Sequence, residues 1–312
     1  MTEKKSISYF PYDDYAQSAN TLFHFMRKPE YLKWILQHHA IAPRYCVENV
    51  EYLNIHIGDR VFREIAVLQK CFCDIPFHKL ADSFPLNGEG NNFKELLPEE
   101  KTELEKRNTH FDYYGEYAIA FSKSWGEVNN LQPIHYLNQE AQYADDFRAV
   151  LENTLSEENL PEQYVQDVIN RLAYMKPLRG LMKRKVQHKG SGELDVELYK
   201  NFHDEREWRY VPKTEKLTSV AMESVIANPK LITLSNRISG WLEMDKYKAL
   251  WLDFSYDDIR YIIVPDLHAR IDMIQEILSI PKEMFSEASD VEMQKHILIS
   301  KILVLNEIRR DW

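Results

Sequence analysis

Residues 201–212 carry the sequence NFHDEREWRYVP, which predicts both a strand and a site. Successive side chains of a strand point to opposite faces, so Glu205, Glu207 and Arg209 would share one face of a strand at 205–211. At a rise of roughly 3.3 Å per residue, the two carboxylates would lie about 7 Å apart. Aligned charges on a half-buried strand are costly unless they are paired or face a wet cleft. This face is therefore a candidate site.

The same face has a plain structural interpretation. Glu205, Glu207 and Arg209 would also suit a surface charge ladder on an edge strand, where opposite charges in one row stabilise each other modestly. The pattern is short, and alone it does not separate the two interpretations.

Composition narrows the class of protein. The 312 residues suffice for one large domain or two ordinary ones, and 44% hydrophobic and 28% charged residues are typical of a folded soluble chain. Only nine residues are glycine, and neither common glycine-rich phosphate loop is present. A net charge of −10 argues against binding nucleic acid through overall charge.

One stretch is nevertheless basic. Residues 176–189 hold the densest group of positive charges, followed by the turn Gly190-Ser191-Gly192. Its centre, Lys183, Arg184 and Lys185, is the candidate surface for nucleic-acid phosphates. A solvated helix end is the alternative interpretation.

Cysteine usage and the chain start indicate the compartment. Cys46, Cys71 and Cys73 cannot form a disulfide framework, and no metal site is predicted because further ligands at zinc spacing are missing. Cys71 and Cys73 fit small buried hydrophobes on one strand face. Met1–Ser6 lacks the apolar core of a signal peptide, and no apolar run approaches a membrane span. We therefore expect a reduced cytoplasmic protein without a membrane partner.

Hydrophobic periodicity predicts a mixed order of elements. The expected strands lie at 21–26, 61–72, 116–123, 133–136, 205–211, 249–254 and 259–264, and the expected helices at 30–38, 98–108, 138–155, 161–176, 265–278 and 286–299. Strands 116–123 and 133–136 would form a hairpin-like unit around Trp125-Gly126. Residues 301–308 suit either state. The inward side of helix 265–278 would carry Ile271, Ile274, Ile277 and Leu278.

The irregular order of these elements favours an α+β fold over a doubly wound sheet. No internal repeat or long linker is present. We expect one domain spanning 1–312 with a helical insertion at 138–190.

Several stretches together resemble the AbiGi abortive-infection family. They are LFHF at 22–25, IAPRYCVE at 41–48, CFCDIP at 71–76, YGEYAIAFSKSWG at 114–126, PIHY at 133–136 and the strand 205–211. That family belongs to bacterial phage-defence systems, and its members are often labelled antitoxins.

The layout is also similar to that of ADP-ribosyltransferase toxins, including those that modify DNA. This resemblance implies split mixed β-sheets with flanking helices, and NAD as the substrate. It matches Glu207 to the catalytic glutamate and Glu205 to the residue that orients the acceptor, although the sequence does not decide firmly between the two. Those toxins also carry an aromatic residue in a middle strand. Tyr117 is the first candidate for this middle aromatic, and Tyr114 is the second.

The resemblance also implies a cofactor site. His24 matches the histidine of the first strand, and the helix after that strand places Arg44 where a pyrophosphate would bind. Phe25, Tyr45 and Tyr114 complete the candidate cofactor-binding set. Without the resemblance, Arg44 would simply pair with Glu48 one helical turn away.

These residue types suit transfer of ADP-ribose. Breaking the bond between nicotinamide and ribose creates positive charge that a carboxylate stabilises, while the carboxylate also orients or deprotonates the attacking group. A histidine can bind ribose hydroxyls, an aromatic ring can stack on nicotinamide, and an arginine can hold phosphate with two hydrogen bonds.

The resemblance leaves three functions open. The first is an NAD-dependent ADP-ribosyltransferase toxin of a toxin–antitoxin system, acting on RNA or DNA or on protein, with an antitoxin as its partner. The second is a non-catalytic antitoxin or interaction protein, and the third is an NAD hydrolase. A dry ion pair between Glu207 and Arg209 or Arg206 would weaken the enzyme interpretation.

Overall fold

The computed structural model describes residues 19–57, 60–190, 192–285 and 290–311. Met1–Ser6, Ser191 of the expected turn and the first four residues of the expected helix at 286–299 lie outside these ranges.

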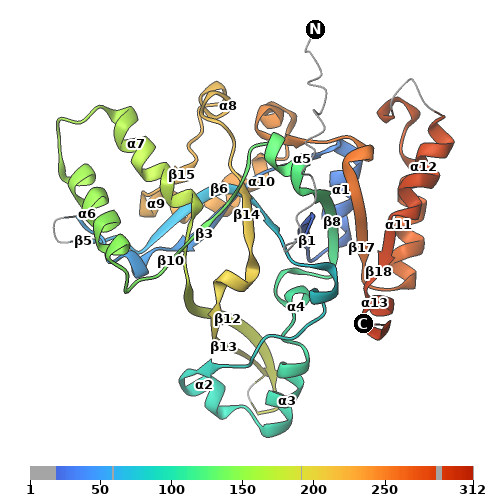
Figure 1. Ribbon diagram of the computed structural model, residues 1–312, viewed down its shortest axis with the longest axis horizontal. Helices are drawn as coiled ribbons and strands as arrows, with labels where there is room; N and C mark the ends of the chain where they lie inside the picture. The colour runs from blue at the N-terminus through green and yellow to red at the C-terminus, as the bar shows by residue number, and fades with distance from the viewer. Residues whose placement is uncertain (1–18, 58–59, 191, 286–289, 312) are drawn as a thin grey trace.

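The centre of the molecule is a mixed β-sheet (Figure 1). Among the described residues it has nine strands, and seven follow the order β18-β17-β8-β1-β6-β14-β9. Only β17 and β18 of these seven run parallel. β3 and β15 both pair with the long strand β6. The bounds are β1 Thr21–Met26, β3 Arg44–Asn49, β6 Glu64–Cys73, β8 Tyr117–Ser122, β9 Leu131–Pro133, β14 Glu207–Tyr210, β15 Val225–Ile226, β17 Ile259–Val264 and β18 Ile302–Val304.

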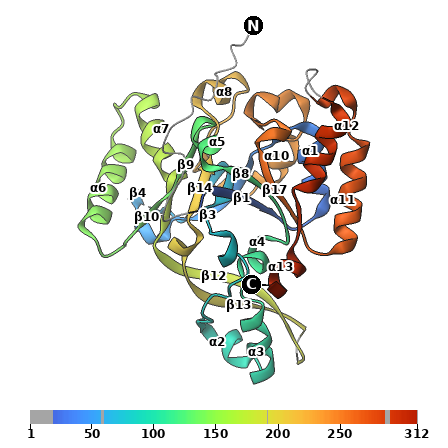
Figure 2. The same cartoon turned by 45° about the vertical axis from the view of Figure 1, so that its right-hand side comes forward.

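Helices and a second small sheet surround this centre (Figures 1 and 2). One end carries α11 (Leu267–Ser279) and α12 (Val291–Ser300), with α1 (Pro29–His38) packed against α11. The opposite end carries α6 (Gln142–Ser156) and α7 (Glu162–Asn170). The third corner holds a hairpin with its covering helices: β12 Arg179–His188, β13 Gly192–Asn201, β7 Gly88–Glu89, α2 Gly90–Glu95 and α3 Pro98–Lys106. The expected α+β class is confirmed.

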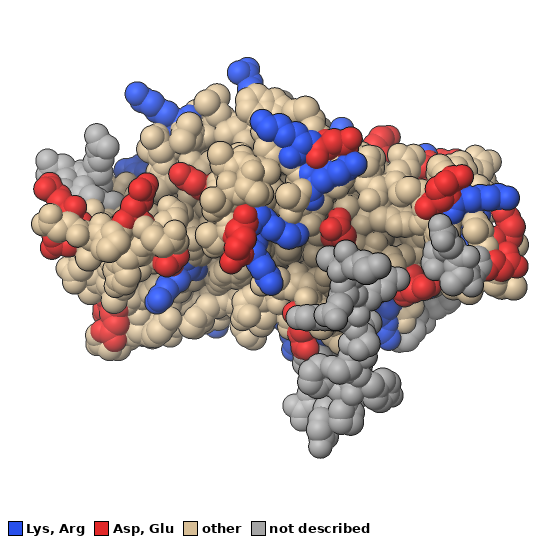
Figure 3. Space-filling view, turned by 90° about the horizontal axis from the view of Figure 1, so that it is seen from above, with Lys and Arg blue, Asp and Glu red and all other residues tan. Residues whose placement is uncertain are grey.

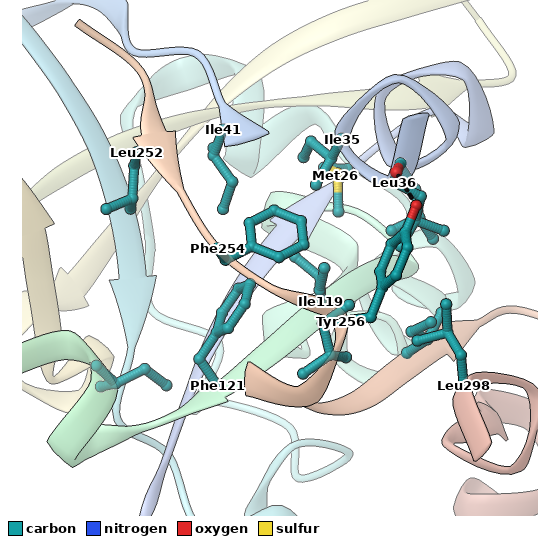
Figure 4. Close-up of a cluster of buried hydrophobic side chains, with 14 of the residues drawn as sticks. Met26, Ile35, Leu36, Ile41, Ile119, Phe121, Leu252, Phe254, Tyr256 and Leu298 are labelled. Carbon is teal, nitrogen blue, oxygen red and sulfur yellow. Dashed lines mark hydrogen bonds between the residues drawn. The ribbon is translucent and has the colours of Figure 1, made fainter. Parts of the chain in front are cut away.

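The main core lies between the sheet and α1 (Figure 4). In β8, Ile119 and Phe121 point into this cluster, while Ala118 and Ala120 pack on the other face of the sheet around Phe23. The alternation of large and small residues therefore lets β8 fill a core on each side. The expected first strand and helix are also confirmed, and α1 buries Leu32, Ile35 and Leu36.

The expected hairpin of 116–123 and 133–136 is wrong. Lys123–Val128 forms the helix α5, which starts where the Ser122 hydroxyl accepts a hydrogen bond from the Trp125 backbone N–H. Strand β9 then pairs with β14. Strand β10 (His135–Leu137), which covers most of the expected second strand, pairs with β11 (Met175–Pro177) and not with β8. A serine N-cap inside an apolar stretch decided the local structure.

The expected inward face of the helix at 265–278 is half wrong. Ile277 is fully buried, but Ile271 and Leu278 are 54% and 46% exposed. Only one stripe of α11 meets the core, together with Met273, so apolar residues beside that stripe stay on the surface. Residues 301–308 adopt both states, as β18 and then α13 (Leu305–Asp311), and the expected strand at 249–254 shrinks to β16 (Leu252–Asp253).

Candidate functional site

A pocket of about 960 Å³ opens between the central sheet and the β12–β13 hairpin. This size falls within the range of roughly 300–1,000 Å³ that is usual for small-molecule sites. Seven of the residues expected from the sequence line it: His24, Phe25, Arg44, Tyr114, Lys183, Glu205 and Glu207. Segments far apart in the chain therefore meet at one site.

The backbone around the two glutamates differs from the expected strand. Glu205 ends a 3₁₀ turn, Phe202–Glu205, and Arg206 has a left-handed φ of 44°. The strand β14 begins only at Glu207. The two carboxylates thus do not share a strand face, but both contact the same cation. Lys176 Nζ lies 2.8 Å from Glu205 Oε2 and 3.0 Å from Glu207 Oε2.

Further cations complete the pairing of each carboxylate. Arg209 Nε donates to Glu207 Oε1 at 2.6 Å, and the Arg209 side chain is fully buried. The same guanidinium donates to Glu48 Oε1 at 3.0 Å and to the Ala173 carbonyl at 2.8 Å. Lys200 Nζ lies 2.8 Å from Glu205 Oε1. The result is a buried network of alternating charges, in which Arg209 forms a dry ion pair with Glu207.

This network fixes the charge of both glutamates. Burial opposes ionisation of Glu205, yet Lys176 and Lys200 hold the pKa of its carboxyl well below the usual range. Burial also opposes ionisation of Glu207, and Arg209 and Lys176 hold its pKa near 2. Both groups are therefore ionised at neutral pH. A general base works best with a pKa near the operating pH, so neither carboxylate is tuned for that role.

Of the two tyrosines considered for the middle aromatic, only Tyr114 reaches the pocket. Its hydroxyl donates a hydrogen bond to Glu205 Oε1, and burial followed by the Glu205 charge raises its pKa well above the usual value. Gly115, with φ 117°, ends the helix behind it at a point where an added Cβ would meet the Met26 carbonyl at 2.1 Å. Tyr117 packs against the main core on β8 and does not line the pocket, so its expected catalytic placement is wrong.

His24 presents one nitrogen to the protein. Its Nδ1 lies 2.9 Å from the Cys71 carbonyl, which can only accept, so Nδ1 carries the hydrogen and Nε2 is an acceptor. Burial, reinforced by Lys70, lowers the pKa of His24 to about 3. A neutral His24 therefore offers a lone pair and no charge. Phe25 lines the pocket and contacts Phe111 edge to face at 5.4 Å between ring centroids.

Arg44 and Tyr45 point to opposite faces of β3. Arg44 lines the pocket, and its Nη1 lies 3.4 Å from Glu243 Oε1 and not beside Glu48. The Tyr45 hydroxyl donates to the Glu223 carbonyl, and its ring belongs to a separate buried cluster. Tyr45 therefore does not line the pocket as expected, because its ring packs into that cluster behind β3.

Comparisons with known proteins identify the family of this chain. The family model described as "Putative abortive phage resistance protein AbiGi, antitoxin" matches residues 102–265. The curated "Abortive phage resistance protein AbiGi" of Lactococcus lactis subsp. cremoris is 32% identical over 283 residues, which cover 88% of this chain and 100% of that protein. The chain belongs to the AbiGi family. No solved structure matches it.

The segment matched by the AbiGi model contains most of the charge network. Lys176, Lys200, Glu205, Glu207 and Arg209 all lie within residues 102–265, whereas His24 and Arg44 precede them. Lys176 and Lys200 were missed as site residues. Lys176 belonged to the basic stretch, but nothing in the sequence indicates that it folds back between two glutamates.

The basic stretch of this AbiGi member lies mainly on the strand β12, so it is not a helix end, and the expected insertion at 138–190 is helical only in its first part. Lys183 and Lys185 are exposed on β12, where Lys185 Nζ lies 2.8 Å from Glu193 Oε2. Arg184 points to the other face, where it donates to Asn108 Oδ1 at 3.1 Å and to the Arg107 carbonyl. Strand alternation thus turns Arg184 toward the protein, away from the exposed Lys183 and Lys185.

The described residues contain neither a metal-binding cluster nor a membrane-spanning helix. Over the described ranges, no group of three or more His, Cys, Asp or Glu side chains is arranged to hold a metal ion. Within the same part of the AbiGi chain, no helix combines the length and apolar character needed to cross a membrane.

Proposed function

We propose that this chain is the antitoxin-type component of an abortive phage-resistance system and that it works by binding a partner protein, not by catalysis. The family description supports the defence role. The observation that carries the non-catalytic part is the dry Arg209–Glu207 ion pair, continued through Lys176 to Glu205. A glutamate that must meet a substrate needs free carboxylate oxygens, and here both oxygens of each glutamate are occupied by cations.

Co-expression with the toxin of the same defence locus tests this function. We expect the toxin alone to stop growth, the chain alone to be harmless, and the pair to restore growth. The Glu207→Gln variant should neutralise the toxin as well as wild type when equal amounts of folded protein are compared, because the Glu207 carboxylate has a structural role here. Glu193→Gln, on the exposed face of β13, is the matched control. A chain that is toxic by itself, with toxicity abolished by Glu207→Gln alone, would contradict the proposal.

A second candidate function is transfer of ADP-ribose from NAD. It is favoured by the convergence of His24, Phe25, Arg44, Tyr114 and the two glutamates on one pocket of about 960 Å³. In this reaction the bond between ribose C1′ and nicotinamide breaks, and nicotinamide leaves with the electron pair. A nucleophile of RNA or DNA bonds to C1′ and loses its proton to a carboxylate or water. With water as the nucleophile, the same site would be an NAD hydrolase.

Labelled NAD distinguishes these chemistries. The purified chain is incubated with NAD labelled in the adenylate part, together with total RNA, DNA or protein, and free nicotinamide is measured in parallel. Label on one acceptor class, lost in Glu207→Gln and kept in Glu193→Gln, would support transfer. Nicotinamide release without labelled acceptor would support hydrolysis. If neither labelled acceptor nor free nicotinamide is detected, binding of a partner remains as the function.

A further inference from the structure

Helices α6 and α7 form a unit that is separate from the pocket. None of the residues that line the pocket within the described ranges belongs to either helix. Their inner sides bury Ala144, Phe147, Leu151 and Val168 in a core shared with β6, β15 and the segment that follows β3. In Figures 1 and 2 the two helices stand at one end of the molecule, with their outer sides turned away from the sheet. The outer sides are thus free to serve another purpose.

Those outer sides expose three large apolar side chains. Tyr143 is 49% exposed, Val150 46% and Tyr164 50%. On α6, positions 143, 146 and 150 follow the three- and four-residue spacing of one helix face, so Tyr143, Asp146 and Val150 lie in one row. On α7, Tyr164 and Asp167 repeat the pairing of a tyrosine with an aspartate three residues later. Each helix therefore offers an apolar ring beside a carboxylate.

The unit is strongly acidic. Residues 138–170 hold eight carboxylates and one arginine, so this tenth of the chain supplies most of its net charge of −10. The arginine, Arg148, is already occupied by Asp145 Oδ1 at 3.0 Å and the Leu53 carbonyl. Asp146 and Asp167 each accept a hydrogen bond from a glutamine four residues earlier, at 2.9 Å and 2.8 Å. In Figure 3 the end of the molecule that carries these helices shows mainly acidic side chains.

We propose that the outer face of α6 and α7 docks a protein with a basic surface around an apolar centre. This inference rests on the proposed function, since that partner is the toxin that the chain neutralises. Interfaces concentrate tyrosine at their centre and use charge around it to select and steer the partner. The clustering of Tyr143, Val150 and Tyr164 with Asp146 and Asp167, for which the described residues supply a glutamine partner and no cation, matches that arrangement. The choice of a basic occupant follows from charge complementarity.

Binding of the full-length chain to the purified toxin of the same locus tests the docking face. We expect Tyr143→Ala combined with Tyr164→Ala to weaken binding by about thirtyfold or more, as for truncated interface centres. Asp146→Lys combined with Asp167→Lys should weaken it further. Asp146→Asn combined with Asp167→Asn keeps the side-chain shape and should lower the salt dependence of the wild-type affinity.

The matched control is the apolar face at the other end of the molecule. Leu267 and Ile271 on α11 are 55% and 54% exposed, and the double variant Leu267→Ala and Ile271→Ala should bind as tightly as wild type. Toxin binding that survives every α6–α7 change would overturn the docking face while leaving the proposed function intact. A change in self-association alone would assign the face to a second copy and also overturn the inference. If wild type neither binds nor neutralises the toxin, the proposed function itself fails.

Discussion

At the scale of single residues, the central feature is that Lys176, Arg209 and Lys200 neutralise two buried glutamates. Removing a charge from water is costly, and the cost is offset only when a partner and hydrogen bonds replace the water. Arg209 meets this requirement by donating to Glu207, Glu48 and a backbone carbonyl. The network therefore depends on every member, and loss of one member leaves an unpaired buried charge.

Replacing Arg209 tests this dependence. Arg209→Met should lower the free energy of unfolding by about 3 kcal/mol, the usual loss when one partner of a buried ion pair is removed. Glu207→Gln combined with Arg209→Met should cost less than the two single changes together, since the second change removes the stranded charge. Urea unfolding of the four proteins measures the coupling. Strictly additive losses would show that the two side chains do not act as a pair.

At the scale of elements, strand alternation and local caps decide which side chains reach the pocket. Arg44 lines it and Tyr45 does not, because the Tyr45 ring packs into a buried cluster on the other side of β3. Arg184 is turned inward on β12 for the same reason, between the exposed Lys183 and Lys185. The 3₁₀ turn before β14 breaks the alternation at Glu205, and in this arrangement Lys176 contacts both glutamates.

Helix α11 offers a direct test of which face supports the fold. Ile277 is fully buried in the main core, so Ile277→Ala should lower the free energy of unfolding by roughly 2–4 kcal/mol. Ile271 is 54% exposed, so Ile271→Ala should change it by less than about 0.5 kcal/mol. Thermal and urea unfolding of the two variants measures this difference. Equal losses of unfolding free energy in the two variants would mean that the side of α11 that carries Ile271 is also buried in solution.

At the scale of the whole molecule, the acidic helical end and the charge-lined pocket are two separate surfaces on one sheet. The pocket lies between the sheet and the β12–β13 hairpin, while α6 and α7 cover the far end of the same sheet. Over the described ranges, no residue of α6 or α7 lines the pocket. This separation lets the binding function and the candidate NAD chemistry be tested by different variants.

The stability of the whole fold should depend on pH through two buried histidines. Burial lowers the pKa of His24 and of His110 to about 3, below the unfolded value of about 6.5. The unfolded chain therefore takes up these protons first, and their stabilising contribution is lost as the pH falls from 6.5 towards 3. Between pH 7.5 and 5.5 we expect a loss of about 1 kcal/mol per histidine. Glu205 and Glu207, with lowered pKa values, keep their contribution until more acidic pH.

Unfolding by urea at pH 7.5 and 5.5 measures this effect. His24→Asn should reduce the pH dependence by the share of one histidine, whereas His268→Asn, at an exposed position on α11, should leave it unchanged. A pH dependence that is the same in wild type and His24→Asn would show that the pKa of His24 does not differ between the folded and unfolded states.

The sequence by itself determined the α+β class, the first strand and helix, and the resemblance to the AbiGi family. It also placed His24, Phe25, Arg44, Tyr114 and the two glutamates among the site residues. These features follow from local periodicity and from motifs that are readable in order along the chain. Only the tertiary structure decided which cations meet the glutamates, that Tyr117 and Tyr45 face buried clusters, and that Arg184 is turned inward. The physical reason is that pairing of buried charges depends on segments such as 176, 200 and 205–209 arriving at one place, and no local pattern records that meeting.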